Sequence, residues 1–231
     1  MSASAKHSVS TFKAVLFDLD GTLIDTAPDF IVCLNDLRAE YNLPPLANLD
    51  IRKVVSDGAR AMVSLAFEIT EGDEGFEQKK QQFLDLYSQN ICRESRLFDS
   101  LDDLLNWCDK NKIPWGIVTN KPRRFSELLL KKLNLETRLS SLVCADDVEN
   151  PKPNAEPMLK ACQELNVKPE DCLYVGDHQR DIDAGKNANM KTIAAAYGYV
   201  HNIDEAESWL AHWTVNTSLE LTQLLSKLLK V

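Results

Sequence analysis

The chain has 231 residues, 44% of them hydrophobic, which suffices for one large domain or for a core with a smaller companion. Its formal net charge of −9 disfavours nucleic acid and anionic membranes as partners, because both would repel it at long range. No stretch reaches the roughly 18 apolar residues of a membrane span, and residues 1–13 lack the apolar centre of a secretory signal. A cytoplasmic location is therefore expected.

The first predicted element is a buried strand over the apolar residues 14–17. It runs into Asp18 and Asp20, with Gly21 and Thr22 directly after them. Two carboxylates this close at the edge of a core repel each other and destabilise the fold unless something compensates their charge. A compensating positive charge is therefore expected beside them.

Residues 26–94 contain helical patterns and no convincing strand, which predicts an all-helical domain inserted into the core. Thr26 and Asp29 have the spacing of a capping box, which predicts the start of the first inserted helix. The core then comprises residues 11–25 and 95–231. The expected helices of the insertion cover residues 26–41, 50–69 with a turn at Gly58, and 76–89.

After the insertion, short apolar segments alternate with helical patterns, which predicts a doubly wound, Rossmann-like parallel sheet of the α/β class. Ser100 and Asp103 predict a capping box at the first helix of this part. The further strands are expected at residues 115–119, 141–145, 172–176 and 192–196, and the helices at 101–108, 125–133, 155–165, 180–188 and 219–229. The six cysteines have no metal-type spacing and are expected to be reduced packing residues.

Polar side chains follow the predicted strands, at the carboxyl ends where parallel sheets bind ligands. Carboxylates without a cysteine or histidine partner suit a hard cation, and Mg2+ in particular. Such a cation attracts a phosphoryl group, whose oxygens Lys152, the Thr119 hydroxyl and the N–H groups of the Gly21 turn would also hold. The residues expected to converge are Asp18, Asp20, Thr119, Asn120, Lys152, Asp177 and Asp181.

Four short motifs at these positions resemble those of the haloacid dehalogenase superfamily, and the resemblance covers essentially the whole chain. The motifs are DLDGT at residues 18–22, VTN at 118–120, Lys152 in KPNAEP, and GDHQRD at 176–181. The resemblance implies that Asp18 is the nucleophile and becomes an aspartyl phosphate. It also implies that Asp20 protonates the leaving oxygen and then activates the hydrolytic water.

The same resemblance implies the metal and phosphate ligands. Asp18, the Asp20 carbonyl and Asp177 correspond to Mg2+ ligands, with Asp181 supporting them from further out. Thr119 and Lys152 correspond to binders of phosphoryl oxygens in the transition state, and Asn120, Gly21 and Thr22 are expected to contact the substrate. His178 departs from many relatives, which carry an acid or a small hydroxyl residue there; it is expected either to cap the next helix or to lie near the substrate.

The helical insertion resembles the C1-type cap of phosphoglycolate phosphatases and β-phosphoglucomutases, which implies a lid over the site. GARAMV, WGIVTNKPRRF and AAYGYVHNIDEAESW are similar to segments of the N-acetylmuramic acid 6-phosphate phosphatases of bacterial cell-wall recycling. The resemblance implies a small acidic phosphorylated metabolite as substrate, N-acetylmuramic acid 6-phosphate or 2-phosphoglycolate. Arg60 is expected to bind its carboxylate.

Two alternatives remain open at this point, a sugar phosphomutase and a receiver-like module that accepts phosphate as a signal. Asp20 favours hydrolysis of phosphate esters over removal of a halide, which leaves without a proton. The oligomeric state is expected to be a monomer or a homodimer. Arg123 and Arg124, beside Lys121, could give the mouth of the pocket a positive rim, but they are interpreted as the solvated start of a helix.

Overall fold

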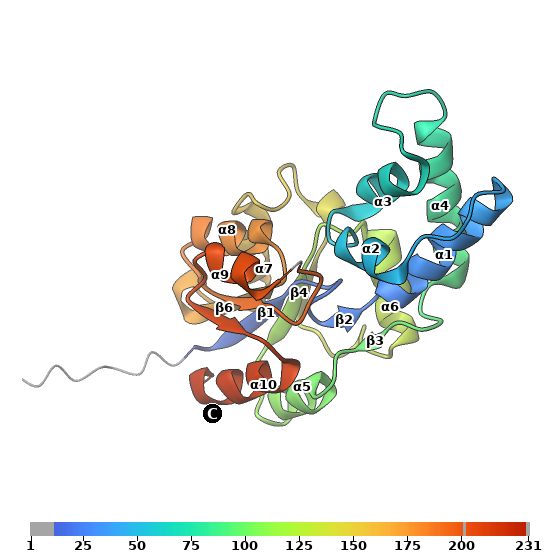
Figure 1. The fold of residues 1–231 in the computed structure, drawn as a ribbon. Helices are drawn as coiled ribbons and strands as arrows, with labels where there is room; N and C mark the ends of the chain where they lie inside the picture. The colour runs from blue at the N-terminus through green and yellow to red at the C-terminus, as the bar shows by residue number, and fades with distance from the viewer. Residues whose placement is uncertain (1–11, 201, 230–231) are drawn as a thin grey trace, which may run out of the picture.

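The computed structural model describes residues 12–200 and 202–229. Within these residues, six parallel strands form one sheet in the order β5-β4-β1-β6-β7-β8 (Figure 1). The predicted α/β class and parallel sheet are confirmed, and β8 is an addition: it lies at the edge of the sheet and buries only Val215, so no buried apolar run marks it. The strands are β1 (Ala14–Phe17), β4 (Trp115–Val118), β5 (Ser141–Val143), β6 (Cys172–Gly176), β7 (Lys191–Ala195) and β8 (Trp213–Val215).

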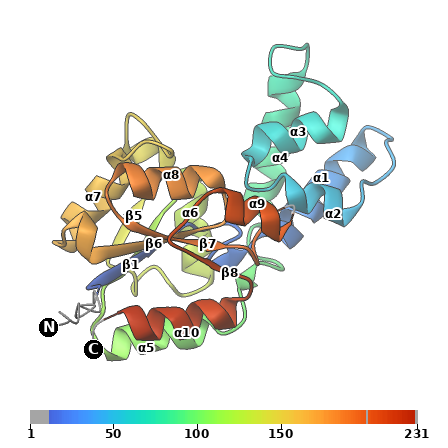
Figure 2. The same ribbon diagram turned by 60° about the vertical axis from the view of Figure 1, so that its left-hand side comes forward.

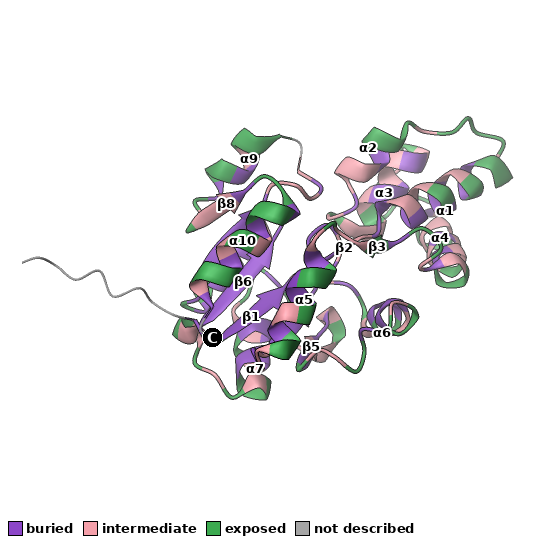
Figure 3. Cartoon of the chain, turned by 90° about the horizontal axis from the view of Figure 1, so that it is seen from below, coloured by how far each residue is buried: buried purple, intermediate pink, exposed green. Residues whose placement is uncertain are grey.

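Helices cover both faces of this sheet, so that its strands lie in the buried centre (Figures 2 and 3). Alternate residues of β1 serve the two faces: Val15 and Phe17 belong to one apolar cluster, Ala14 and Leu16 to the other. None of the described helices is both long and apolar enough to cross a membrane. One face carries α5 (Leu101–Lys110), α6 (Arg123–Lys132) and α10 (Ser218–Leu228), and the other α7 (Glu156–Leu165), α8 (Gln179–Asn187) and α9 (Ile203–Ser208).

The strand order reverses direction around β1, which places the site. The chain passes from β1 to β4 and β5 on one side, and then continues with β6, β7 and β8 on the other. In the register of the sheet, Phe17 pairs with Ile117 on one side and with Val175 on the other. The residues that follow these three therefore emerge at one level of the carboxyl edge, where open α/β sheets bind ligands.

Four described helices form a separate group beside this edge and confirm the inserted helical cap (Figure 1). The two linkers pair as a short antiparallel ribbon of β2 (Ile24–Asp25) and β3 (Arg96–Leu97), so the insertion leaves and re-enters the core at one place. The predicted boundaries at 26 and 94 fall next to this ribbon and stay a prediction; the outer limits 11 and 231 lie outside the described residues. The cap helices are α1 (Ala27–Glu40), α2 (Asn48–Lys53), α3 (Gly58–Phe67) and α4 (Phe76–Asn90).

Both predicted capping boxes are wrong. Thr26 has helical backbone angles and makes no side-chain cap, and Ser100 has a left-handed φ of 65° and also makes none. Asp29 instead accepts hydrogen bonds from the N–H groups of Cys92 and Glu94, at 2.6 and 2.7 Å, and from the hydroxyl of Ser95. The returning linker passes the start of α1 and brings three donors to the buried carboxylate of Asp29, which therefore does not cap the helix.

We expect Asp29→Ala to lower the free energy of unfolding by about 2–4 kcal/mol, because it leaves two N–H groups and a hydroxyl without their acceptor. Asp29 is only 2% exposed, so water cannot replace the lost carboxylate freely. Urea unfolding measures the change. Asp36→Ala, at an exposed position of the same helix, is the matched control and should change stability by less than about 0.5 kcal/mol. Equal midpoints for the two variants would contradict the assigned role.

Candidate active site

Three carboxylates meet at the carboxyl edge of the sheet. Asp18 directly follows β1, Asp177 directly follows the neighbouring β6, and Asp181 lies in the first turn of α8. Each offers an oxygen that lies within 4.8 Å of the others. Asp177 and Asp181 are buried and Asp18 is half-buried, so their repulsion is only weakly screened by water.

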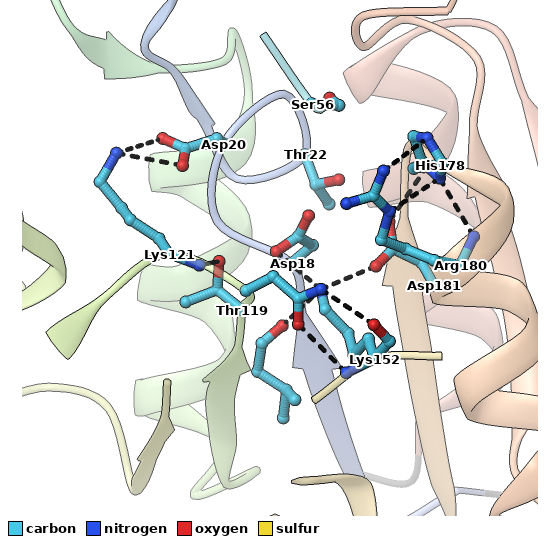
Figure 4. Close-up of polar contacts among 12 residues, drawn as sticks. Asp18, Asp20, Thr22, Ser56, Thr119, Lys121, Lys152, His178, Arg180 and Asp181 are labelled. Atoms are coloured by element: carbon cyan, nitrogen blue, oxygen red, sulfur yellow. Dashed lines mark hydrogen bonds and ion pairs between the residues drawn. The ribbon is translucent and has the colours of Figure 1, made fainter. Parts of the chain in front are cut away.

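Lys152 places one positive charge beside these acids. Its Nζ lies 2.9 Å from Asp18 Oδ1 and 2.7 Å from Asp181 Oδ1, and its side chain is 1% exposed (Figure 4). It also donates to the carbonyl of Val118 and to the hydroxyl of Tyr174. Burial lowers the pKa of Lys152, but the charges of Asp18 and Asp181 outweigh this effect and raise it. Lys152 therefore stays charged in the folded protein.

One ammonium group does not neutralise three carboxylates. Burial, together with the remaining negative charge, raises the pKa values of two of them. Burial, followed by the charges of Asp18 and Asp181, raises the pKa of Asp177 to about 7. Burial also raises the pKa of Asp181. The raised pKa of Asp177 means that the folded state binds the proton of this carboxyl more tightly than the unfolded state does. The stability that protonated Asp177 contributes is therefore fully present below about pH 3.8 and is lost as the pH rises through about 7.

This cluster has the properties of a site for a hard divalent cation. Its ligand atoms are all oxygens, and its charge is excessively negative. Asp18 Oδ1 forms an ion pair with Lys152, but the geometry of this contact is not that of a hydrogen bond. Among the described residues, this oxygen is the one buried side-chain nitrogen or oxygen atom without a hydrogen bond. A cation beside Asp18 and Asp177 would satisfy both the charge and this oxygen.

The side chain of Asp177 is held in place by groups from three other segments. Its Oδ1 accepts from Thr22 Oγ1 at 2.8 Å, and its Oδ2 accepts from the N–H of Tyr199 and the hydroxyl of Ser56, both at 3.0 Å. Gly21 has a φ of 82°, and a Cβ there would lie 2.2 Å from Asp177 Oδ2. Thr22 and Gly21 thus contact Asp177, while their expected contact with substrate stays a prediction.

Asp20 faces away from this cluster, toward a second lysine. Lys121 Nζ lies 2.9 and 3.0 Å from its two carboxylate oxygens (Figure 4). Thr26 Oγ1 also donates to Asp20 Oδ1, at 2.7 Å. Lys121 also donates to the hydroxyl of Tyr87 in α4, which links the acid to the cap. Lys121 is buried, with a side chain that is 5% exposed, and the sequence pattern predicts no role for it in the site. Its position two residues after Thr119 is the signal, since alternate residues of an extended segment point the same way.

Thr119 and Asn120 extend the site from the end of β4. The Thr119 hydroxyl accepts from the N–H of Lys121 at 3.2 Å, and Thr119 is 4% exposed. Asn120 exchanges two hydrogen bonds with the backbone of Lys152, at 2.9 and 3.1 Å. Asn120 therefore positions the loop that carries Lys152, and its expected contact with substrate stays a prediction.

A cavity of about 310 Å³ lies between the core and the cap and includes these groups. Its volume falls at the lower end of the range for small-molecule sites. Asp18, Asp20 and Thr119 belong to its core side, and Met62 and Leu84 are among the apolar residues that the cap contributes. The enclosed space therefore suits a small polar molecule with some apolar surface.

Arg60 and His178 lie at this cavity in different settings. The Arg60 side chain is 64% exposed, and its Nη1 lies 3.1 Å from Glu71 Oε2, so its binding of a carboxylate stays a prediction. His178 caps α8, because its Nδ1 accepts from the N–H of Arg180 at 3.1 Å while Asp181 accepts from the N–H of His178. It also lines the cavity, so the two alternatives for His178 are not exclusive.

Comparison with known proteins agrees with this geometry. The family model for haloacid dehalogenase-like hydrolases matches residues 15–195. The N-acetylmuramic acid 6-phosphate phosphatases of Pseudomonas putida and Pseudomonas aeruginosa are 43% and 44% identical over 217 residues, covering 94% of this chain and 97% and 96% of theirs. A phosphoglycolate phosphatase of Xanthomonas campestris is 38% identical over 199 residues, covering 86% of this chain and 90% of its own.

Among solved structures, the fold is similar to that of a predicted phosphoglycolate phosphatase from Haemophilus somnus, with a TM-score of 0.81 and 26% identity. The match covers 92% of this chain and 97% of that one. The likeness therefore extends over the sheet and the helical insertion together.

Proposed function

Because the chain belongs to the haloacid dehalogenase-like hydrolase family and is a phosphatase of that family, we propose that it hydrolyses N-acetylmuramic acid 6-phosphate with the help of Mg2+. The observation that carries the proposal is the placement of Asp18 at the cavity, between Lys152 and the other two acids. The named phosphatases among its relatives favour hydrolysis over the phosphomutase and receiver alternatives.

In the first half of the reaction, a carboxylate oxygen of Asp18 attacks phosphorus and forms an aspartyl phosphate. The bond between phosphorus and the leaving oxygen breaks, and its electron pair stays on that oxygen, which takes a proton from Asp20. Lys152 and the Thr119 hydroxyl bind the phosphoryl oxygens, whose negative charge is greatest in the transition state. The product alcohol then leaves the cavity.

In the second half, Asp20 takes a proton from a water molecule, and this water attacks the phosphorus of the aspartyl phosphate. The bond to the Asp18 oxygen breaks, which releases inorganic phosphate and restores the carboxylate. Lys121 and Thr26 hold Asp20 through hydrogen bonds, and Tyr87 ties Lys121 to the cap. The acid and base group is therefore oriented from both the core and the cap.

The acid cluster fits Mg2+, which takes few protein ligands and prefers oxygen. Asp18, the Asp20 carbonyl and Asp177 would hold the ion, and Asp181 would support it while bound to Lys152 and to the N–H of His178. When bound, Mg2+ would neutralise charge on the phosphoryl oxygens. The three groups that hold Asp177 keep this ligand oriented without the ion.

A second candidate substrate is 2-phosphoglycolate, which the 38% identity to a phosphoglycolate phosphatase supports. Both molecules combine a phosphate monoester with a carboxylate. The higher identity to the two sugar-acid phosphatases favours N-acetylmuramic acid 6-phosphate.

Phosphate release from a panel of phosphomonoesters tests the proposal. We expect N-acetylmuramic acid 6-phosphate to have the highest kcat/KM, and a chelator to reduce the rate by at least about 100-fold, with recovery on adding Mg2+. Full activity in chelator would contradict the metal assignment. A higher kcat/KM for 2-phosphoglycolate would favour the second candidate, and isomerised sugar phosphate without free phosphate would favour a mutase.

A further inference from the structure

A cluster at the cavity joins the core to the cap and has no part in the steps above. Arg180 Nη2 lies 3.1 Å from Asp57 Oδ1, and His178 Nε2 lies 3.3 Å from the same oxygen. Arg180 and His178 belong to the start of α8 in the core, whereas Asp57 precedes α3 in the cap. All three residues line the cavity that contains Asp18.

The two ring nitrogens of His178 contact both Arg180 and Asp57. Its Nδ1 accepts from the backbone N–H of Arg180 at 3.1 Å and from Arg180 Nε at 3.2 Å. Its Nε2 lies 3.3 Å from Asp57 Oδ1 and 3.1 Å from Arg180 Nη2, and it donates to Asp57 in the tautomer that carries the proton on Nε2. Two donors, one of them a guanidinium, therefore converge on a single carboxylate oxygen (Figure 4 shows Arg180 and His178).

We propose that Arg180 and His178 form the subsite for the substrate's carboxylate, and that the Asp57 carboxylate marks its position. The inference rests on the proposed function, since it names the part of that site which recognises the acid group. A substrate carboxylate that enters the cavity would take the same two hydrogen bonds and displace Asp57. Charge-assisted bonds from a planar guanidinium suit this exchange, because one carboxylate replaces another of the same geometry.

The other cations of the cavity are less suited to this role. Lys152 and Lys121 are buried and bind the carboxylates of the catalytic groups. Arg60 and Lys80 belong to the cap and form ion pairs with acids whose side chains are more than half exposed. Arg180 instead lies in the same core segment as Asp177 and Asp181, so its position relative to the bound phosphate does not depend on how the cap moves.

Selectivity between two matched sugars tests the subsite. N-acetylmuramic acid 6-phosphate differs from N-acetylglucosamine 6-phosphate only by a lactyl ether that bears the carboxylate, so the ratio of their kcat/KM values reports recognition of that group. We expect Arg180→Met to reduce this ratio by about 30-fold. Arg180→Lys should reduce it by less, since lysine keeps the positive charge but lacks the planar set of N–H donors of the guanidinium. His178→Asn, which can still cap α8, should reduce it by about 5-fold.

Asp57→Asn supplies a test in the opposite direction. It removes the charge that competes for the two donors, so we expect it to lower the KM for N-acetylmuramic acid 6-phosphate by about 3-fold and to raise the ratio. If the cluster only held the cap closed, each of the variants Arg180→Met and Asp57→Asn would change kcat/KM for both substrates by the same factor and leave the ratio unchanged. That result would overturn the subsite.

Arg60→Met is the comparison among the arginines of the cavity. If Arg60→Met reduces the ratio of kcat/KM values and Arg180→Met leaves it unchanged, the assignment of the subsite to Arg180 is overturned and Arg60 is supported instead. A wild-type ratio near one would also overturn it. A wild-type protein that releases phosphate from no acidic sugar phosphate would refute the proposed function itself, and the subsite with it. Thermal unfolding of each variant shows that losses of the ratio come from folded protein.

Discussion

Asp18→Asn is expected to reduce phosphate release by at least about ten-thousand-fold while the protein remains folded. The amide oxygen is a poor nucleophile, and the aspartyl phosphate then cannot form. Lys152 keeps its ion pair with Asp181, so the substitution leaves no buried cation without a partner. The measurement is inorganic phosphate released per enzyme, with a circular dichroism spectrum of the same sample.

The same variant should be more stable than the wild type in chelator above about pH 7. Removing the charge of Asp18 removes one of the causes that raise the pKa of Asp177, so ionising Asp177 costs the folded state less. Asp103→Asn, at an exposed position of α5, is the matched control and should change neither activity nor stability. Residual turnover within about 100-fold of the wild type would rule out Asp18 as the nucleophile.

Lys152→Met is expected to lower the free energy of unfolding in chelator by about 3–5 kcal/mol and phosphate release by about a thousand-fold. Its Nζ contacts two of the three clustered carboxylates and is buried with them, so the variant leaves those charges without their cation. The loss of stability should grow as the pH rises through the range in which Asp181 ionises, because burial raises the pKa of Asp181 and the charge of Lys152 opposes this effect. Urea unfolding across this pH range measures it.

Adding Asp181→Asn to Lys152→Met should restore part of the lost stability, because it removes one of the unpaired charges, but it should not restore activity. Mg2+ should also stabilise the single variant, since an ion that binds the folded state shifts the equilibrium toward it. Lys110→Met, at an exposed position of α5, is the matched control and should change stability by less than about 0.5 kcal/mol. If the two single variants unfold at the same denaturant concentration, Lys152 does not stabilise the acid cluster.

The placement of Asp18, Thr119, Lys152 and Asp177 could be predicted from the sequence, because it depends on local pattern and on one general rule. Short apolar runs alternating with helical segments predict parallel strands, and parallel strands end at a common edge. The polar residues directly after β1, β4 and β6 then share that edge whatever the details of packing.

Two parts of the site could not be predicted in this way. In the sequence, Lys121 looks like any lysine near the start of an exposed helix. Only the folded chain brings Asp20 and Tyr87 to it and so makes it a buried partner of the Asp20 carboxylate. Arg180 and His178 show their common role only where Asp57 of the cap meets them. No spacing along the chain signals these contacts, because Lys121 is 34 positions from Tyr87 and 101 from Asp20, and His178 is 121 positions from Asp57.

By itself, then, the sequence determined the fold class, the inserted cap and the edge of the sheet where the polar residues gather, because these follow from the periods of apolar residues and from side chains at strand ends. Only the tertiary structure decided which hydrogen-bond donors the carboxylates of Asp29 and Asp20 contact. Asp29 accepts from the returning linker rather than capping its helix, and Asp20 pairs with Lys121, since a buried polar group takes the partner that packing brings to it.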